Sequence, residues 1–111
     1  MFFRLYTGDD GQSHFEEMDL NEGPIKWSEV QNATGIMYRH HEPGNYIDWH
    51  IAPRRQYLIT LAGEVEIVIG DGTAKRSGAG DVMLAEDTSG QGHITHVVSD
   101  APRISVAIPV D

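Results

Sequence analysis

The feature that most constrains this chain is the regular return of turn residues between short runs of alternating apolar and polar residues. From residue 34 onward such runs recur roughly every 8–12 residues, a spacing typical of β-sandwiches and β-barrels. Twelve glycines and five prolines supply the turns. We find no long run with helical periodicity. This spacing therefore predicts an all-β protein and fits a sandwich and a barrel equally well.

The expected strands can be placed from this alternation. In the second of them, Ile47 and Trp49 share one face, and Asp48 and His50 share the other. Trp49 should then pack outside the barrel wall, against either a second subunit or the N-terminal arm. The expected strands are 35–40, 46–51, 56–61, 64–69, 73–76, 82–86, 93–98 and 103–110.

The N-terminal third is less regular, and 13–20 could be a strand or a short arm. We find no linker, repeat or low-complexity tract. We therefore expect one domain over residues 1–111, with a barrel core at about 34–110 and an N-terminal strand or arm at 1–33.

Charge and composition exclude several classes of partner and site. The formal net charge is −9, which argues against nucleic acids and anionic membranes, because both require a basic surface. The chain has no cysteine, so disulfides, zinc–thiolate sites and thiol nucleophiles are excluded. Residues 1–6 do not have the pattern of a signal peptide, and no apolar run approaches the roughly 20 residues of a membrane helix. We expect a cytoplasmic protein.

Two groups of glycine and histidine residues resemble the two motifs of the cupin superfamily. The first motif, G-x5-H-x-H-x3-E-x6-G, is matched at Gly44, His50 and Gly63, with Gln56 at the position of the glutamate. The second contains G-x2-H, which is matched at 90–93. The resemblance covers about 34–110 and implies the cupin fold, a small antiparallel β-barrel or jelly roll.

Within the superfamily, the chain is similar to small single-domain bacterial cupins of unassigned activity. The similar segments are His50–Gln56, which contains Ala-Pro-Arg-Arg, and Glu86–His93, which begins Glu-Asp-Thr. The turn at 78–82 also resembles the glycine-rich turn that precedes the second cupin motif. Since cupins commonly form dimers, the resemblance also implies a homodimer.

The resemblance implies a metal site with a reduced set of ligands. A metal cupin uses two histidines and a glutamate from the first motif and one histidine from the second. Here His50 and His93 are kept, whereas Ala52 and Gln56 replace the other two. We expect at most a weakly held divalent transition metal at His50, His93 and Gln56. Asp48, on the same strand face as His50, could supply the missing carboxylate.

These residues predict a polar pocket inside the barrel that binds a small molecule, formed by His50, Gln56 and His93 with Asp48 and Thr95 nearby. One alternative is a metal-dependent cupin enzyme, a dioxygenase or isomerase, with the reduced ligand set. A second alternative is a non-enzymatic scaffold in which the barrel only dimerises.

Other polar residues have two interpretations each. Arg54 and Arg55 could attract an anionic substrate to the barrel mouth, or could form salt bridges with the abundant acids. Glu86 and Asp87 could provide a general base near His93, or could be ordinary loop residues. His96 should point away from the pocket unless a bulge intervenes. The remaining histidines, His14, His40 and His41, are expected on the surface.

Overall fold

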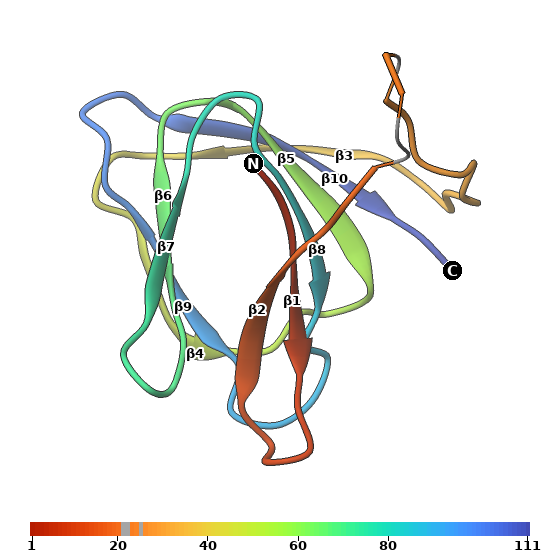
Figure 1. Cartoon of the computed structure of the whole chain (residues 1–111). Helices are drawn as coiled ribbons and strands as arrows, with labels where there is room; N and C mark the ends of the chain where they lie inside the picture. The colour runs from red at the N-terminus through yellow and green to blue at the C-terminus, as the bar shows by residue number, and fades with distance from the viewer. Residues whose placement is uncertain (21–22, 25) are drawn as a thin grey trace.

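The protein folds into two facing β-sheets, which confirms the predicted all-β class (Figure 1). The computed structural model describes residues 1–20, 23–24 and 26–111. No helix of the described residues is long and apolar enough to cross a membrane. The strands in chain order are β1 (Phe2–Thr7), β2 (Ser13–Glu17), β3 (Met37–His41), β4 (Tyr46–His50), β5 (Gln56–Ala62), β6 (Val65–Val68), β7 (Ala74–Ser77), β8 (Val82–Glu86), β9 (His93–Val97) and β10 (Arg103–Pro109).

One sheet has six strands in the order β2-β1-β8-β5-β10-β3, and the other has four in the order β4-β9-β6-β7. The chain crosses repeatedly between the two, so neighbours in the sequence seldom pair within one sheet, as in a jelly roll. The pairings are antiparallel apart from β1 with β8, which is parallel. Because the sheets face each other, alternate residues of each strand point into a shared interior.

Each strand expected from residue 35 onward is present within about two residues of its predicted bounds. Within the segment 13–20, which was expected to be a strand or a short arm, residues 13–17 form the strand β2. The sequence reasoning missed β1, which pairs with β2 on one side and β8 on the other. Its side chains Phe3 and Leu5 are fully buried, so the packed interior also includes residues before 34.

The apolar core lies where β1 and β8 of one sheet face β6 of the other. Phe3, Leu5, Val65 and Ile67 are each at most 1% exposed. Phe15 of β2 closes this core with an edge-to-face contact on Phe3, with ring centroids 5.9 Å apart. The rest of the interior is lined in large part by polar side chains. It lies between β3, β5 and β10 on one side and β4 and β9 on the other.

The segment that leads into β3 runs outside the barrel beside the end of β10 (Figure 1). Ala33 forms an isolated bridge with Val110, and the Thr34 amide donates to the Pro109 carbonyl. The Tyr57 hydroxyl donates to Gln31 Oε1 at 2.7 Å. These contacts hold the segment against the outer face of the six-stranded sheet and leave the interior to the strands.

Candidate functional site

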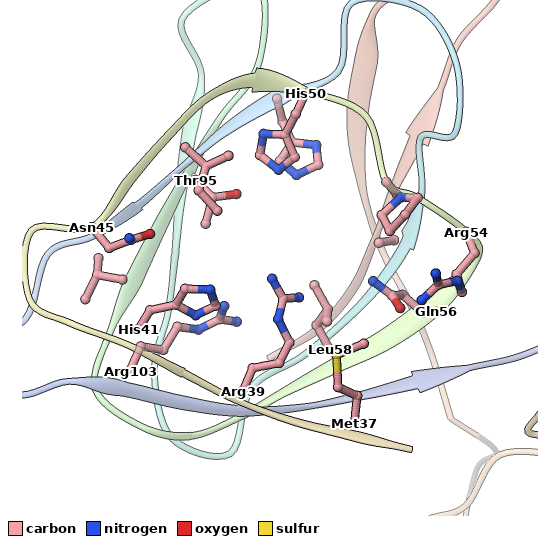
Figure 2. Close-up of a pocket in the computed structure, with 16 residues that line it drawn as sticks. Met37, Arg39, His41, Asn45, His50, Arg54, Gln56, Leu58, Thr95 and Arg103 are labelled. Carbon is pink, nitrogen blue, oxygen red and sulfur yellow. The ribbon is translucent and has the colours of Figure 1, made fainter. Parts of the chain in front are cut away.

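A cavity of about 290 Å³ lies between the two sheets, next to the apolar core. The two regions share Ala52, Leu58 and Ala85 as a common wall. Figure 2 shows the polar side chains that point into the cavity from its other walls. These side chains come from β3, β4, β5, β9 and β10 and from the loops before and after β4.

Four of the five residues predicted for the pocket line this cavity: His50, Gln56, His93 and Thr95. Asp48 does not line it, and the predicted face of Asp48 is wrong. The β4–β9 pairing shifts register between Ile47 and His50, which inserts an extra residue and reverses the alternation. Ile47 and His50 therefore both face inward, whereas Asp48 is exposed and accepts a hydrogen bond from the Trp49 amide at 2.9 Å.

The two motif histidines are neighbours, with ring centroids 4.3 Å apart and planes at 56°. Gly92 makes this approach possible. Its φ is +77°, and a Cβ at this position would collide with the His50 carbonyl group, so the loop before His93 can pass there only as glycine. Gly90, the glycine of the G-x2-H motif, is restricted in a similar way, because its φ is also +77° and a Cβ there would collide with the Gly11 carbonyl oxygen.

Hydrogen bonds fix the tautomer of each ring. His50 Nδ1–H donates to the Asp48 carbonyl at 2.8 Å, since a carbonyl can only accept. His93 Nδ1–H donates to Asp87 Oδ2 at 2.6 Å. Each ring is left with Nε2 for a ligand. Burial lowers the pKa of His50, and the nearby His93 and Arg39 lower it further against the opposing effects of Asp48 and Asp87. His50 therefore offers a neutral imidazole at pH 7.

Asp87 links the cavity to the apolar core. It is fully buried, and its Oδ2 accepts a second hydrogen bond from Ser13 Oγ of β2 at 2.7 Å. Of the two acids considered as partners of His93, the structure therefore selects Asp87. Glu86 instead accepts hydrogen bonds from Arg55 at 2.8 Å and Arg4 at 3.4 Å. Arg55 thus follows the salt-bridge interpretation.

The donors at the cavity do not fit a tightly held divalent metal. No group of three or more histidine, cysteine or acidic side chains comes together in the described part of the chain. Gln56 is buried with an unpartnered Oε1, but it lies away from the imidazole pair (Figure 2). Ala52 contributes no donor. Two imidazoles without an anionic ligand make a weak site, and the charged side chains that line the cavity are arginines.

Three arginines also line the cavity: Arg39 of β3, Arg103 of β10 and Arg54 of the loop after β4. The sequence reasoning considered only Arg54. The alternation within 35–40 and 103–110 could have placed Arg39 and Arg103 on the inward faces, but it does not tell which cations lack a partner. His41, expected on the surface, also lines the cavity, because it shares a face with Arg39.

Burial and mutual repulsion act on these cationic groups. Arg103 is 4% exposed, and burial together with the nearby Arg39 lowers its pKa to about 10. Burial also lowers the pKa of Arg39. The pKa of His41 is lowered by burial first and then by Arg39, Arg103 and His40. The cavity is therefore a region of positive potential within an acidic protein.

The two residues expected outside the barrel wall lie there. Trp49 is 41% exposed and lies outside the cavity lining. His96 also points away from the cavity and packs edge-to-face on Tyr46, with ring centroids 5.5 Å apart. The register shift in β4 does not extend to β9, so His96 keeps the predicted orientation.

No family model matches the chain, and neither does any curated protein. Solved structures do match. An uncharacterised conserved protein with a double-stranded β-helix domain from Klebsiella pneumoniae is 23% identical, with a TM-score of 0.53, and the match covers 71% of this chain and 73% of that one. A Cupin 2 conserved barrel domain protein from Salinispora arenicola is 22% identical, with a TM-score of 0.55, over 77% and 69% of the two chains.

A cupin domain from Bordetella pertussis is 14% identical, with a TM-score of 0.53, over 74% of this chain and 92% of that one. At these identities the likeness concerns the fold. It confirms the cupin barrel expected from the motifs. The chemistry of the cavity has to be argued from the residues themselves.

Proposed function

We propose that the protein binds a small organic molecule in the cavity between its two sheets. The cavity volume of about 290 Å³ is close to the lower end of the roughly 300–1,000 Å³ of small-molecule sites. Its lining combines apolar side chains such as Met37, Ile47 and Leu58 with a few inward-facing polar groups. This combination is typical of sites that enclose a ligand and orient it through a few hydrogen bonds.

The observation that carries the proposal is that two buried residues of the cavity lining each have a polar atom without a partner in the described part of the chain. Gln56 Oε1 and Arg103 Nε make no hydrogen bond, although the two residues are 3% and 4% exposed. An unsatisfied buried polar group costs about 1–3 kcal/mol. Neither atom has appreciable accessible surface, so a bound molecule would pair with them after their side chains turn toward the cavity, and that pairing would offset the cost.

A thermal-shift screen of small metabolites tests the proposal, with a Thr95→Phe variant as the matched control. Thr95 lines the cavity but carries none of the unpartnered atoms, so a phenyl ring there should fill the space and leave the wall chemistry intact. We expect compounds that raise the melting temperature of the wild type and not that of the variant. Equal stabilisation of both proteins, or of neither, would contradict binding in the cavity.

A metal-dependent enzyme has weaker support. What favours it is the close pair of imidazoles, His50 and His93, each with a free Nε2. Elemental analysis of protein purified without a chelator or an affinity tag tests this alternative, beside the His50→Ala/His93→Ala double variant. Near-stoichiometric metal that is lost in the variant would make it the leading hypothesis.

We also propose that the partner of the barrel is a second copy of the same chain. β3 is an edge strand of the six-stranded sheet, and its backbone is free to pair on one side. Tyr38 on β3 is 74% exposed, and Leu61 and Ile104 on nearby strands are 52% and 40% exposed. A solution mass equal to the monomer would contradict this proposal and the purely dimeric scaffold together.

The acidic composition favours a protein that avoids nucleic acids and anionic membranes, and the absence of cysteine is consistent with the proposed cytoplasmic location. Fractionation of cells that express the untagged chain tests this location.

A further inference from the structure

The arginines of this protein divide into two groups. Outside the cavity, each described arginine has an acidic partner: Arg4 pairs with Glu16, Arg55 with Glu86 and Arg76 with Glu66. The three that line the cavity, Arg39, Arg54 and Arg103, form no ion pair with any residue the structure describes. This division is notable because the chain has 17 acidic residues and only 8 lysines and arginines.

The cavity wall contains no acidic side chain among the described residues. Asp87, the nearest buried carboxylate described above, lies behind His93 and is already bonded to it and to Ser13. Among the described residues, Arg39 and Arg103 therefore face the cavity without a counter-charge, and the exposed Arg54 also lines it unpaired. Because the rest of the molecule is strongly acidic, this local excess of cations is specific to the cavity.

The guanidinium of Arg103 makes one hydrogen bond within the described residues, although it carries five N–H donors. Its Nη2–H donates to Thr60 Oγ1 at 3.1 Å, whereas its Nε has no partner. Arg39 makes no hydrogen bond within the described residues, and Figure 2 shows its side chain extending from β3 into the cavity, opposite His50. Register places the two arginines diagonally across β3 and β10, since Arg39 pairs with Ser105 and Arg103 with His41.

We propose that the ligand of this cavity is a small organic anion whose carboxylate or phosphate group is held by Arg39 and Arg103. Two diagonal guanidinium groups present several N–H donors to one anionic group, an arrangement that matches the planar, bidentate geometry of arginine recognition. The apolar wall at Leu58 and Met37 favours an organic anion over a simple inorganic ion. This inference rests on the proposed function and names the class of ligand.

The far end of the ligand meets the two imidazoles. Both rings use Nδ1–H for the protein, so a neutral His50 offers the lone pair of Nε2 to a hydrogen-bond donor on the ligand. Thr95, from the same wall as His93, adds a hydroxyl that can donate or accept. The complementary ligand carries an anionic group at one end and a hydroxyl or amine at the other.

Titration calorimetry at low ionic strength with malate, phosphate, glycerol phosphate and glycerol as probes tests the inference. The proteins are the wild type, Arg39→Met, Arg103→Met and the control Arg76→Met, whose arginine is exposed and paired outside the cavity. We expect at least one anionic probe to bind the wild type and Arg76→Met equally. Its affinity should fall by about tenfold or more in each cavity variant, as for loss of a charged hydrogen bond. Malate and the two phosphates separate carboxylate from phosphate recognition.

Two results would overturn the inference, and they differ in what they leave standing. If a neutral compound binds the wild type and is blocked by Thr95→Phe, while the anions bind all four proteins alike, the cavity binds ligands but not anions. If no compound of either kind binds the wild type, the proposed function fails as well. Circular dichroism of each variant checks that the fold is retained.

Discussion

The interior of this barrel contains two neighbouring regions that are opposite in chemistry. In the apolar core, Phe3 and Leu5 are fully buried and pack against other hydrocarbon side chains. In the cavity, Gln56 and Arg103 are almost as buried, but atoms of both lack a partner. Burial of the first kind stabilises the fold, whereas burial of the second kind destabilises it. Polar residues that are buried in the cavity at a cost in stability are best explained by a role in binding.

The largest expected effect is in the core. Leu5→Ala removes a fully buried side chain and should cost about 2–5 kcal/mol of unfolding free energy, from lost burial and the cavity left behind. Leu61→Ala is the matched control, because Leu61 is 52% exposed on the outer side of β5. Urea denaturation of both variants measures the difference. Equal losses would mean that the core is not where the stability of the barrel originates.

The next effect concerns the residue that joins the two regions. Asp87→Ala leaves Ser13 Oγ–H and His93 Nδ1–H without their acceptor in a buried position, and should cost about 2–4 kcal/mol. Ser13→Ala, which removes one of the two hydrogen bonds and leaves the carboxylate on His93, should cost less.

A test within the cavity accompanies the stability measurement. In Asp87→Ala the His93 ring loses the hydrogen bond that fixes its tautomer, so ¹⁵N spectra of the histidines should show a mixture of tautomers at His93. An unchanged single tautomer would show that Asp87 acts only as part of the core.

The sequence was sufficient to predict the strands from residue 35 onward and the motif residues of the cavity. Turn glycines and alternation predicted the strands from β3 to β10, and motif spacing placed His50, Gln56 and His93 on the cavity wall. The strand β1 was missed although it forms an antiparallel pair with the neighbouring β2, and its parallel pairing with β8, some 80 residues away, has no local signal in the sequence.

The errors at the site have the same long-range origin. Asp48 was placed on the wrong face because the register shift in β4 arises from pairing with β9, which strict alternation ignores. The role of Arg39 and Arg103 depends on the absence of nearby acids in the folded state, and no pattern along the chain reveals that absence. His41 was assigned to the surface because it stands next to a turn, whereas it lies on the inward face of β3 with Arg39.

Replacing the buried Arg103 should raise the free energy of unfolding, whereas replacing Leu5 in the core should lower it. Burial and Arg39 lower the pKa of Arg103, so the folded state disfavours its cation at every pH below about 10, and the penalty is relieved only above that value. Arg103→Met should therefore raise the unfolding free energy at pH 7 by about 1–3 kcal/mol. Arg76→Met, at an exposed position, should change it by about 0.5 kcal/mol or less. A loss of stability in Arg103→Met would mean that the cavity arginine stabilises the fold as the core does.

The smallest effect is a dependence on pH that arises in the cavity. The pKa of His41 is lowered by burial, Arg39, Arg103 and His40, so the unfolded chain takes up a proton there at a higher pH than the folded chain. Stability should consequently decrease as the pH falls from about 6.5 through the lowered pKa, and His50 contributes in the same direction. His41→Gln should reduce the loss of melting temperature between about pH 7.5 and 5 without abolishing it.

Arg39→Met should reduce this loss of melting temperature too, because one of the charges that opposes protonation of His41 is gone. An undiminished loss in both variants would place the pH-sensitive groups outside the cavity, whereas a reduced loss in both would show that the arginines and His41 act as one positively charged cluster.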